Sequence, residues 1–307
     1  MEELKQSNYY YGDMGSFGDG TNTPIERKDI IIQSLWTKPL TDKTRTKYML
    51  FIAALSLAYA HANGYKVHMH TDSVGYEWLK NFGYDKLVKT LDKIPDSVPT
   101  DLFAAGKFYA MKAEGIVDKV HIDIDVFLKK PGVLDVFYRD KKADFICQQE
   151  EDIEQDNHAD KIYHMHILGY PTTTRPNWKG SMNTGIIGFH NKSLATKYFN
   201  NYFNALKIYT ADKFRKYKLE GGYEYLMFDF ILEQITLSYM SIGYKPYVLI
   251  PTYNATFTAD QLGYQHLQGD TKWSVESQAK IRNLLMQKNE KLYSILEKQV
   301  EELKAKT

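Results

Sequence analysis

Apolar, strand-like runs alternate with helix-like segments along most of the chain, and this alternation constrains the fold more than any other feature. Runs typical of buried strands cover residues 29–36, 65–72 and 119–125. Helical patterns cover residues 42–62, 74–82 and 101–115. Strands and helices that alternate at these lengths predict an α/β fold with a doubly wound, mostly parallel sheet.

The second half of the chain continues this pattern and ends in a charged tail. Strands are expected over residues 143–149 and 184–189, and helices near residues 193–208 and 223–239. In residues 274–307 apolar side chains recur near heptad spacing, namely Ile281, Leu285, Leu292, Leu296 and Leu303. This tail is expected to be an amphipathic helix packed on the domain, with a homodimer seam or a peripheral membrane contact as alternatives.

The first residues of the chain follow a different pattern. Residues 1–26 are rich in Gly, Tyr, Asn and Ser, which predicts an irregular arm or a flap. We therefore expect three parts: the arm over residues 1–26, an α/β domain over residues 27–273, and the helical tail over residues 274–307.

The charge balance and the single cysteine narrow the class of protein. Lys plus Arg (39) nearly equals Asp plus Glu (38), so no strong field points to nucleic acid as a partner. Cys147 has no second cysteine to pair with, which agrees with a reducing compartment. The N-terminus lacks a signal-peptide pattern, and the apolar run over 48–60 falls short of the roughly 18–20 residues that span a bilayer. We expect a cytoplasmic protein, with the inner face of the membrane as a second location.

Several polar and aromatic residues fall at the carboxyl ends of the expected strands, where doubly wound sheets bind their ligands. These residues are Trp36, Asp72, Asp123 and Asp125. An aromatic ring can stack on a base, and a carboxylate at a strand end can accept hydrogen bonds from ribose or base. Trp36 and Asp72 are therefore expected at the nucleotide end of a ligand site.

The segment His121-Ile-Asp-Ile-Asp-Val-Phe127 ends an apolar strand with two carboxylates. Where the strand bends into a turn, Asp123 and Asp125 can converge on one divalent cation, and hard oxygen ligands suit Mg²⁺ or Mn²⁺. Two carboxylates in such an apolar setting are costly to bury without compensation. The alternative is a pair of carboxylates that caps the next turn.

A second motif lies about 140 residues later, in Tyr264-Gln-His-Leu-Gln-Gly-Asp-Thr-Lys-Trp273. His266 can supply an imidazole nitrogen to the same cation. Gly269 lets the backbone approach a phosphate, and Lys272 can neutralise the phosphate charge. Taken alone, His266 is more often a hydrogen-bonded surface residue; the acidic motif makes the ligand role the favoured interpretation.

Together the two motifs resemble glycosyltransferase family 8 and related bacterial sugar transferases. The resemblance implies a GT-A catalytic domain over residues 27–273, with Asp123, Asp125 and His266 holding Mn²⁺ (or Mg²⁺) and with Gly269 and Lys272 contacting the donor diphosphate. It also implies a UDP-sugar donor and retention of the anomeric configuration, although the residues themselves do not distinguish uracil from guanine. One departure is that Lys272 directly precedes Trp273, where the family usually has a proline between them.

Four further residues complete the predicted site. The resemblance to GT-A enzymes implies that Lys107, shortly before the acidic strand, lies near the donor sugar or phosphate. Ser181-Met-Asn-Thr-Gly185 resembles a turn that lines the sugar pocket in related enzymes, which implies that Asn183 binds sugar hydroxyls. Glu233 and Gln234 interrupt an apolar helix and resemble in position an Asp-Gln pair of family 8, which gives them, with Asp125, the catalytic roles. The alternatives are solvent exposure for Lys107, turn formation for Asn183 and a structural hydrogen bond for the pair.

The expected function is transfer of a sugar from the UDP-sugar to a hydroxyl of a glycan or glycolipid, as in polysaccharide biosynthesis. Acceptor contacts are expected in residues 150–179. An inverting enzyme would need a general base, for which Glu224, Asp229 and Glu233 are candidates. A sugar-phosphate nucleotidyltransferase and a non-catalytic carbohydrate-binding protein are the alternatives; the first is disfavoured because no glycine-rich loop follows the first strand.

Overall fold

The structure is a computed structural model of the 307-residue chain. It describes residues 29–115, 117–139, 141–152, 180–209, 229–250, 255–267 and 269–305. The expected arm over residues 1–26, the candidate base Glu224 and most of the expected acceptor segment lie outside the described residues.

In the described part of the chain, seven strands form one sheet in the order β3-β2-β1-β4-β7-β6-β8. The strands are β1 (Ile30–Leu35), β2 (Lys66–Thr71), β3 (Lys86–Val88), β4 (Val120–Ile122), β6 (Phe145–Asp152), β7 (Gly180–Phe189) and β8 (Pro246–Val248). Only β7 runs antiparallel to its neighbours β4 and β6; the other described pairs are parallel. The prediction of a mostly parallel α/β sheet is confirmed.

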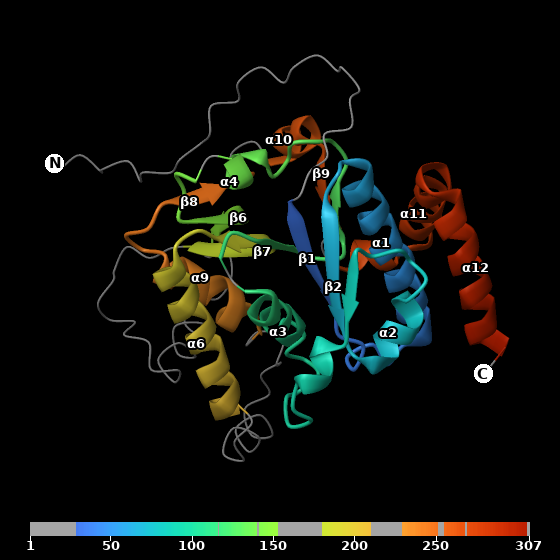
Figure 1. The fold of residues 1–307 in the computed structure, drawn as a ribbon, viewed down its shortest axis with the longest axis horizontal. Helices are drawn as coiled ribbons and strands as arrows, with labels where there is room; N and C mark the ends of the chain where they lie inside the picture. The colour runs from blue at the N-terminus through green and yellow to red at the C-terminus, as the bar shows by residue number, and fades with distance from the viewer. Residues whose placement is uncertain are drawn as a thin grey trace.

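Helices cover both faces of this sheet (Figure 1). On one side lie α1 (Lys43–Ala62), α11 (Val275–Lys288) and α12 (Glu290–Ala305), and on the other lie α3 (Ala105–Glu114), α6 (Lys192–Tyr209) and α9 (Thr236–Met240). Shorter helices are α2 (Ser73–Leu79), α4 (Asp135–Arg139), α10 (Ala255–Leu262), the 3₁₀ helices Thr90–Lys93 and Gly269–Trp273, and the π-helix Ile231–Ile235. The two layers give two apolar cores, one beneath α1 and one beneath α3 and α6.

Helix α1 is apolar around most of its circumference because it is covered on two sides. Its residues from Leu50 to Ala60 are all buried between the sheet and the C-terminal helices. Asp42 begins the helix by accepting a hydrogen bond from the Arg45 amide at 2.9 Å, and Asn63 ends it. This arrangement fixes β1 and β2 side by side and brings their carboxyl ends to one edge of the sheet.

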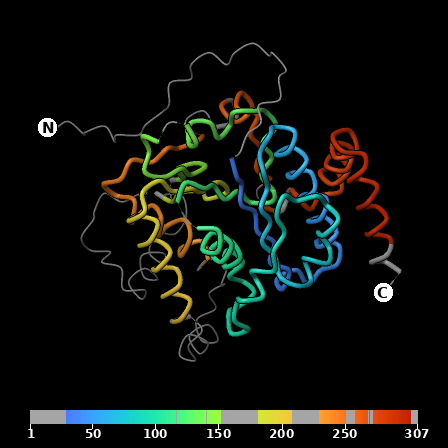
Figure 2. Tube along the Cα trace, viewed as in Figure 1, coloured from blue at the N-terminus to red at the C-terminus, as the bar shows by residue number. Residues whose placement is uncertain are grey.

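The tail forms two helices, where the sequence predicted one. Asn289 separates them: it ends α11, and its side chain accepts a hydrogen bond from the Leu292 amide at 3.0 Å, which starts α12. Figure 2 shows both helices, in red, beside the blue α1. Four of the heptad-spaced apolar residues of the tail are buried in the core shared with α1, namely Ile281, Leu285, Leu292 and Leu296.

The tail therefore packs on the domain over its described residues, as the first of the three interpretations expected. A homodimer seam and a membrane contact stay predictions. Among the described helices, none combines the length and the apolar content that crossing a bilayer demands.

A second, two-stranded sheet connects the middle of the chain to its C-terminal part. It pairs β5 (Val126–Leu128) with β9 (Tyr264–His266) in antiparallel register. Val126 lies opposite His266, so the residues just before β5 meet the residues at the end of β9. This pairing has no signal in the sequence periodicity, and it positions the site described next.

Candidate functional site

The acidic motif forms a turn at the carboxyl end of a completely buried strand. β4 lies between β1 and β7, and the backbone leaves it at Asp123, whose amide donates to the Gly185 carbonyl at 2.9 Å. The Val126 amide then donates to the Asp123 carbonyl at 3.0 Å, which closes a turn. The turn brings Asp123 and Asp125 to the same place, as their spacing at a strand end predicted.

His266 reaches this turn because β9 pairs with β5. The Leu267 amide donates to the Asp125 carbonyl at 3.0 Å, next to the pair Val126–His266. The imidazole Nε2 lies 3.3 Å from Asp125 Oδ1. One ligand atom from each of Asp123, Asp125 and His266 lies within 4.8 Å of the others. The three predicted metal ligands therefore meet, although about 140 residues separate the two motifs.

Two lysines neutralise part of the negative charge in this cluster. Lys107, on α3, lies 3.0 Å from Asp123 Oδ1, pairs with Glu233 and donates to the Thr184 carbonyl at 2.9 Å. Its side chain is only 7% exposed. Lys272, on the 3₁₀ helix after β9, donates to Asp125 Oδ2 at 2.6 Å. Lys107 was predicted near the donor and is buried inside the cluster; solvent exposure, its alternative, is wrong.

Burial and neighbouring charges move the pKa values of this cluster in opposite directions. Removal from water, with the charges of Glu233 and Asp125, raises the pKa of Asp123 to about 6 although Lys107 opposes the shift. Burial also acts on Asp125, but His266 and Lys272 outweigh it and hold the pKa of Asp125 well below its usual range. Burial works against the charge of Lys107, and Asp123 and Glu233 outweigh it and raise its pKa.

The donor set of the cluster fits a divalent cation. Three carboxylates (Asp123, Asp125 and Glu233) pair with two ammonium groups, so carboxylate groups outnumber the lysine cations in the cluster. Two carboxylate oxygens and an imidazole nitrogen are ligands that Mn²⁺ and Mg²⁺ accept. Asp123 is the more open of the two aspartates, with 31% of its side chain exposed, so the cluster is reachable from solvent.

Glu233 and Gln234 lie in the π-helix Ile231–Ile235, a rare helix type that often marks functional sites. Glu233 joins the cluster through Lys107. The side-chain oxygen of Gln234 is buried and makes no hydrogen bond within the described part of the chain. Asp229, the other described candidate base, accepts from the Ala104 amide at 2.7 Å and from the Tyr202 hydroxyl at 3.4 Å.

The remaining predicted residues lie in different settings. Asn183 is buried on β7, donates to Glu151 at 2.9 Å and accepts from the Gly185 amide at 3.0 Å. Gly269 is exposed with φ +62, a conformation that favours glycine. Asp72 caps α2 through the Gly75 amide and accepts from Thr37, all at 2.8 Å. Trp36 is 8% exposed and packs in the core beneath α3. Their ligand roles stay predictions.

Three residues of the cluster's surroundings were missed by the sequence analysis. Gln148 contacts both Tyr264 and His266 through its side-chain oxygen, and His121 lies beside Asp123. Burial lowers the pKa of His121 well below its usual value, and its Nδ1 makes no hydrogen bond among the described residues. The only sequence signal for Gln148 was its place as a polar residue inside an apolar strand. No sequence signal indicated that it would contact His266.

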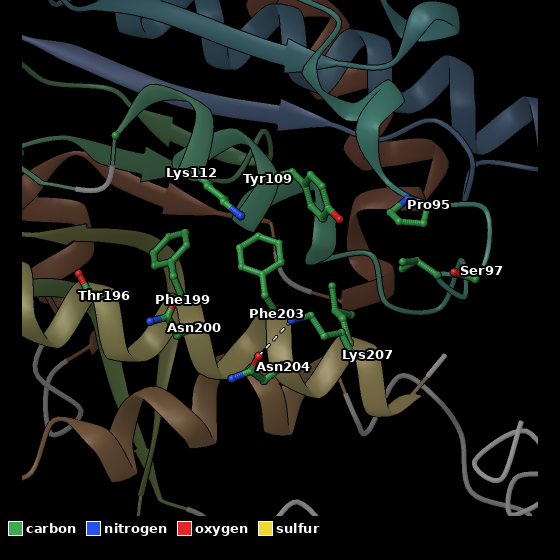
Figure 3. Close-up of a pocket in the computed structure, with 13 residues that line it drawn as sticks. Pro95, Ser97, Tyr109, Lys112, Thr196, Phe199, Asn200, Phe203, Asn204 and Lys207 are labelled. Atoms are coloured by element: carbon green, nitrogen blue, oxygen red, sulfur yellow. Dashed lines mark hydrogen bonds between the residues drawn. The ribbon is translucent and has the colours of Figure 1, made fainter. Parts of the chain in front are cut away.

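A hollow of about 570 Å³ lies elsewhere, between α3 and α6. Figure 3 shows Tyr109 and Lys112 of α3 facing Phe203 and Asn204 of α6 across it. The Lys112 ammonium sits 4.3 Å from the centre of the Phe203 ring. None of the predicted site residues is among the described residues that line it. The chemistry predicted from the sequence is therefore not centred on this hollow.

Comparison with solved structures supports the fold. The chain is similar to the apo structure of WbbM, a bifunctional glycosyltransferase, with a TM-score of 0.50 and 13% identity, covering 92% of this chain and 53% of that one. It also resembles the galactosyltransferase LgtC in complex with donor and acceptor sugar analogs (TM-score 0.43, 13% identity, 83% and 95% covered). Mouse xyloside xylosyltransferase 1 matches with a TM-score of 0.39 and 10% identity, covering 73% and 85%.

At 13% identity, the similarity to WbbM bears on the fold alone, and it confirms the predicted GT-A type of α/β architecture. Membership of glycosyltransferase family 8 stays a prediction. No curated protein shows a significant sequence match to the chain. The family model described as "Family of unknown function (DUF6734)" matches residues 30–299, which is most of the chain. The chain therefore belongs to the DUF6734 family.

Proposed function

We propose that this protein is a divalent-metal-dependent glycosyltransferase that moves a sugar from a UDP-sugar to a hydroxyl of a glycan or glycolipid, with retention of the anomeric configuration. The observation that carries the proposal is the convergence of Asp123, Asp125 and His266 within 4.8 Å at the edge of the sheet. Doubly wound sheets bind nucleotides at this edge. The fold similarity to the glycosyltransferase WbbM agrees with this class of enzyme.

In this proposal Asp123, Asp125 and His266 hold Mn²⁺ or Mg²⁺, which supplies Lewis-acid stabilisation of the charge on the departing nucleoside diphosphate. Lys272 donates a hydrogen bond of 2.6 Å to Asp125 and follows the left-handed Gly269. Its ammonium is proposed to move from the carboxylate to a phosphate oxygen when the donor binds. Lys107 forms ion pairs with both Asp123 and Glu233 and so lies between the two carboxylates. Each lysine thus has a distinct task.

The acceptor oxygen forms a bond to the anomeric carbon as the bond from that carbon to the diphosphate oxygen breaks, and the hydroxyl proton passes to the departing diphosphate. Retention is favoured over inversion because the described candidate bases are engaged by protein groups. Glu233 pairs with Lys107, and Asp229 accepts from the Ala104 amide. Gln234, with a buried oxygen that lacks a partner among described residues, is the proposed polar contact to the sugar.

Asn183 is proposed to bind sugar hydroxyls, and Trp36 and Asp72 to border the nucleotide. Asp72 is partly exposed at the start of α2, beside the carboxyl end of β1, which agrees with a place near ribose. Trp36 is 8% exposed, so only a small part of its surface is open to a base. The acceptor contacts are proposed for residues 150–179, and a cytoplasmic location at the inner membrane face would suit a glycolipid acceptor.

Calorimetric titration of UDP with and without Mn²⁺ tests the proposal. We expect UDP to bind at least about tenfold more tightly with Mn²⁺, because a cation held by the protein would offer coordination positions to phosphate oxygens. Binding that ignores Mn²⁺ would favour a carbohydrate-binding protein instead. Screening UDP-sugars by UDP release then identifies the donor, and NMR of the product anomer tests retention: a β-linked product from an α-donor would contradict it.

A further inference from the structure

We infer that Gln148 is a positioning residue that fixes the imidazole of His266 in the tautomer able to bind a cation. Gln148 lies on β6, is 3% exposed and does not belong to either predicted motif. The inference rests on the proposed function, since it assigns a role towards the same cation. It concerns a state of the metal-free protein that is measurable in its own right.

The side-chain oxygen of Gln148 accepts two hydrogen bonds. Its Oε1 lies 2.7 Å from His266 Nδ1 and accepts from the Tyr264 hydroxyl at 2.6 Å. A carbonyl oxygen has only acceptor sites, so the imidazole must place its proton on Nδ1. When the ring is neutral, its lone pair lies on Nε2, the nitrogen that lies 3.3 Å from Asp125 Oδ1. A second ring proton at Nε2 would donate to Asp125, and a cation bound there would replace it.

The strand geometry shows that this contact is built. Tyr264 and His266 are two residues apart on β9, so both side chains project from the same face of that strand. Burial, followed by the charges of Asp123 and Asp125, raises the pKa of Tyr264 well above its usual value. The phenol therefore stays a proton donor to Gln148 and occupies the second acceptor site of the amide oxygen.

An irregularity between β6 and β7 creates the room for this contact. The pairs Cys147–Ile187 and Gln149–Asn183 are two residues apart on β6 and four apart on β7, so β7 bulges opposite Gln148. Gly185 lies in that bulge. A Cβ at Gly185 would come within 2.4 Å of Gln148 Oε1 and 2.8 Å of His266 Nδ1. Only a residue without a side chain lets the amide and the imidazole meet there.

A flipped side-chain amide of Gln148 would give His266 the opposite tautomer. If the amide were turned over, its NH₂ group would donate to Nδ1, and Nε2 would carry the proton and donate it to Asp125. His266 would then be a hydrogen-bond partner of the aspartate with no lone pair facing the cluster. The two arrangements differ in which ring nitrogen carries the proton, and nitrogen NMR distinguishes them.

The test combines the tautomer of His266 with the affinity for Mn²⁺ alone. In metal-free protein labelled with ¹⁵N-histidine, at a pH of about 8 where free imidazole is neutral, we expect the Nδ1–H tautomer for His266. In Gln148→Leu we expect this tautomer to lose its dominance and the Kd for Mn²⁺ to rise about 10–100-fold. Gln148→Glu, which keeps acceptor oxygens at the same place, is the matched control and should retain the tautomer.

Two outcomes would overturn the inference: an Nε2–H tautomer of His266 in the unsubstituted protein, or Mn²⁺ affinity unchanged in a folded Gln148→Leu variant. If that variant does not fold, Tyr264→Phe removes the second hydrogen bond to the amide, and a smaller loss of the same tautomer is expected. Failure of the unsubstituted protein to bind Mn²⁺ would contradict the proposed function, and the His266 tautomer would then decide the positioning role alone.

Discussion

In the described part of the chain, the cluster of charged side chains around Glu114 and the cluster around Asp123 are built in opposite ways. Around Glu114, at the end of α3, one carboxylate receives four partners: His68 and His70 at 3.1 Å each, Lys119 at 3.3 Å, and Lys86. Around Asp123, three carboxylates share two lysines and one imidazole. The first cluster is saturated with donors, whereas the second has more carboxylate oxygens than fixed cations.

This difference separates a structural network from a ligand site. The Glu114 cluster joins α3 to the strands β2 and β3 and needs nothing from solvent. Beside Asp123, the buried Nδ1 of His121 has no hydrogen-bond partner among the described residues, and the same holds for Oε1 of Gln234, which follows Glu233 in the sequence. Perturbation of the first cluster should therefore change stability, and perturbation of the second should change ligand binding.

The largest expected effect is on activity. Asp125→Asn keeps the shape of the side chain but removes a charged cation ligand, so UDP release from the donor should fall on the order of 10³-fold. Asp96→Asn, which changes a fully exposed carboxylate paired with Lys38, is the matched control and should keep the activity of the unsubstituted protein. Equal rates for Asp125→Asn and its control would remove Asp125 from the site.

Removal of a lysine from the ligand cluster should destabilise the fold unless a cation replaces it. Lys107→Met leaves Glu233 and Asp123 without their buried partner, so the free energy of unfolding should drop by about 3 kcal/mol. Urea denaturation with and without Mn²⁺ measures this loss, and Mn²⁺ should restore part of it. If Mn²⁺ did not stabilise the variant, the carboxylates left without Lys107 would not be binding a cation, and the proposed metal site would be contradicted.

The Glu114 cluster should make stability depend on pH. Burial lowers the pKa of His70 from 6.5 to about 4, although Glu114 opposes the shift. Between pH 6.5 and 4 this histidine is protonated in the unfolded chain but neutral in the folded protein. The stabilisation that depends on neutral His70 is therefore complete above pH 6.5 and is lost as the pH falls towards 4. The loss should be on the order of 2–3 kcal/mol. In His70→Gln, the unfolding free energy measured with urea should change less steeply with pH in this range. Some pH dependence should remain, because the pKa of buried His121 is shifted in the same direction.

The smallest effect is expected for Glu114 itself. Glu114→Gln keeps hydrogen-bonding capacity but removes the charge, which should cost about 1–2 kcal/mol of unfolding free energy and leave Mn²⁺ and UDP binding unchanged. Glu77→Gln, at an exposed carboxylate that pairs with Lys80, is the control and should leave stability nearly unaffected. A change in Mn²⁺ affinity for Glu114→Gln would mean that the two clusters are coupled.

The sequence predicted the parts of the site that depend on strand ends. Buried runs ending in Asp123 and Asp125 predict where the carboxylates lie, because the carboxyl ends of parallel strands meet at one edge. The place of His266 was predicted only through the paired motifs. Its physical cause, the three-residue pairing of β5 with β9, is too short to leave a periodic signal.

The environment of the site was less predictable. Asp72 and Trp36 fall at strand ends as expected, yet one caps α2 and the other fills a core, and a strand-end position does not determine a side chain's partners. Gln148 depends on a bulge in β7 and on the missing Cβ of Gly185, which are tertiary features. The break of the tail at Asn289 has a local cause, a capping side chain within an otherwise continuous heptad-like pattern.

The most direct test of the account is a crystal structure with Mn²⁺ and UDP, using anomalous scattering from manganese. We expect one strong anomalous peak between the side chains of Asp123, Asp125 and His266, with the diphosphate on its solvent side and Lys272 moved from Asp125 to a phosphate oxygen. A peak elsewhere, or UDP bound away from these three residues, would contradict it.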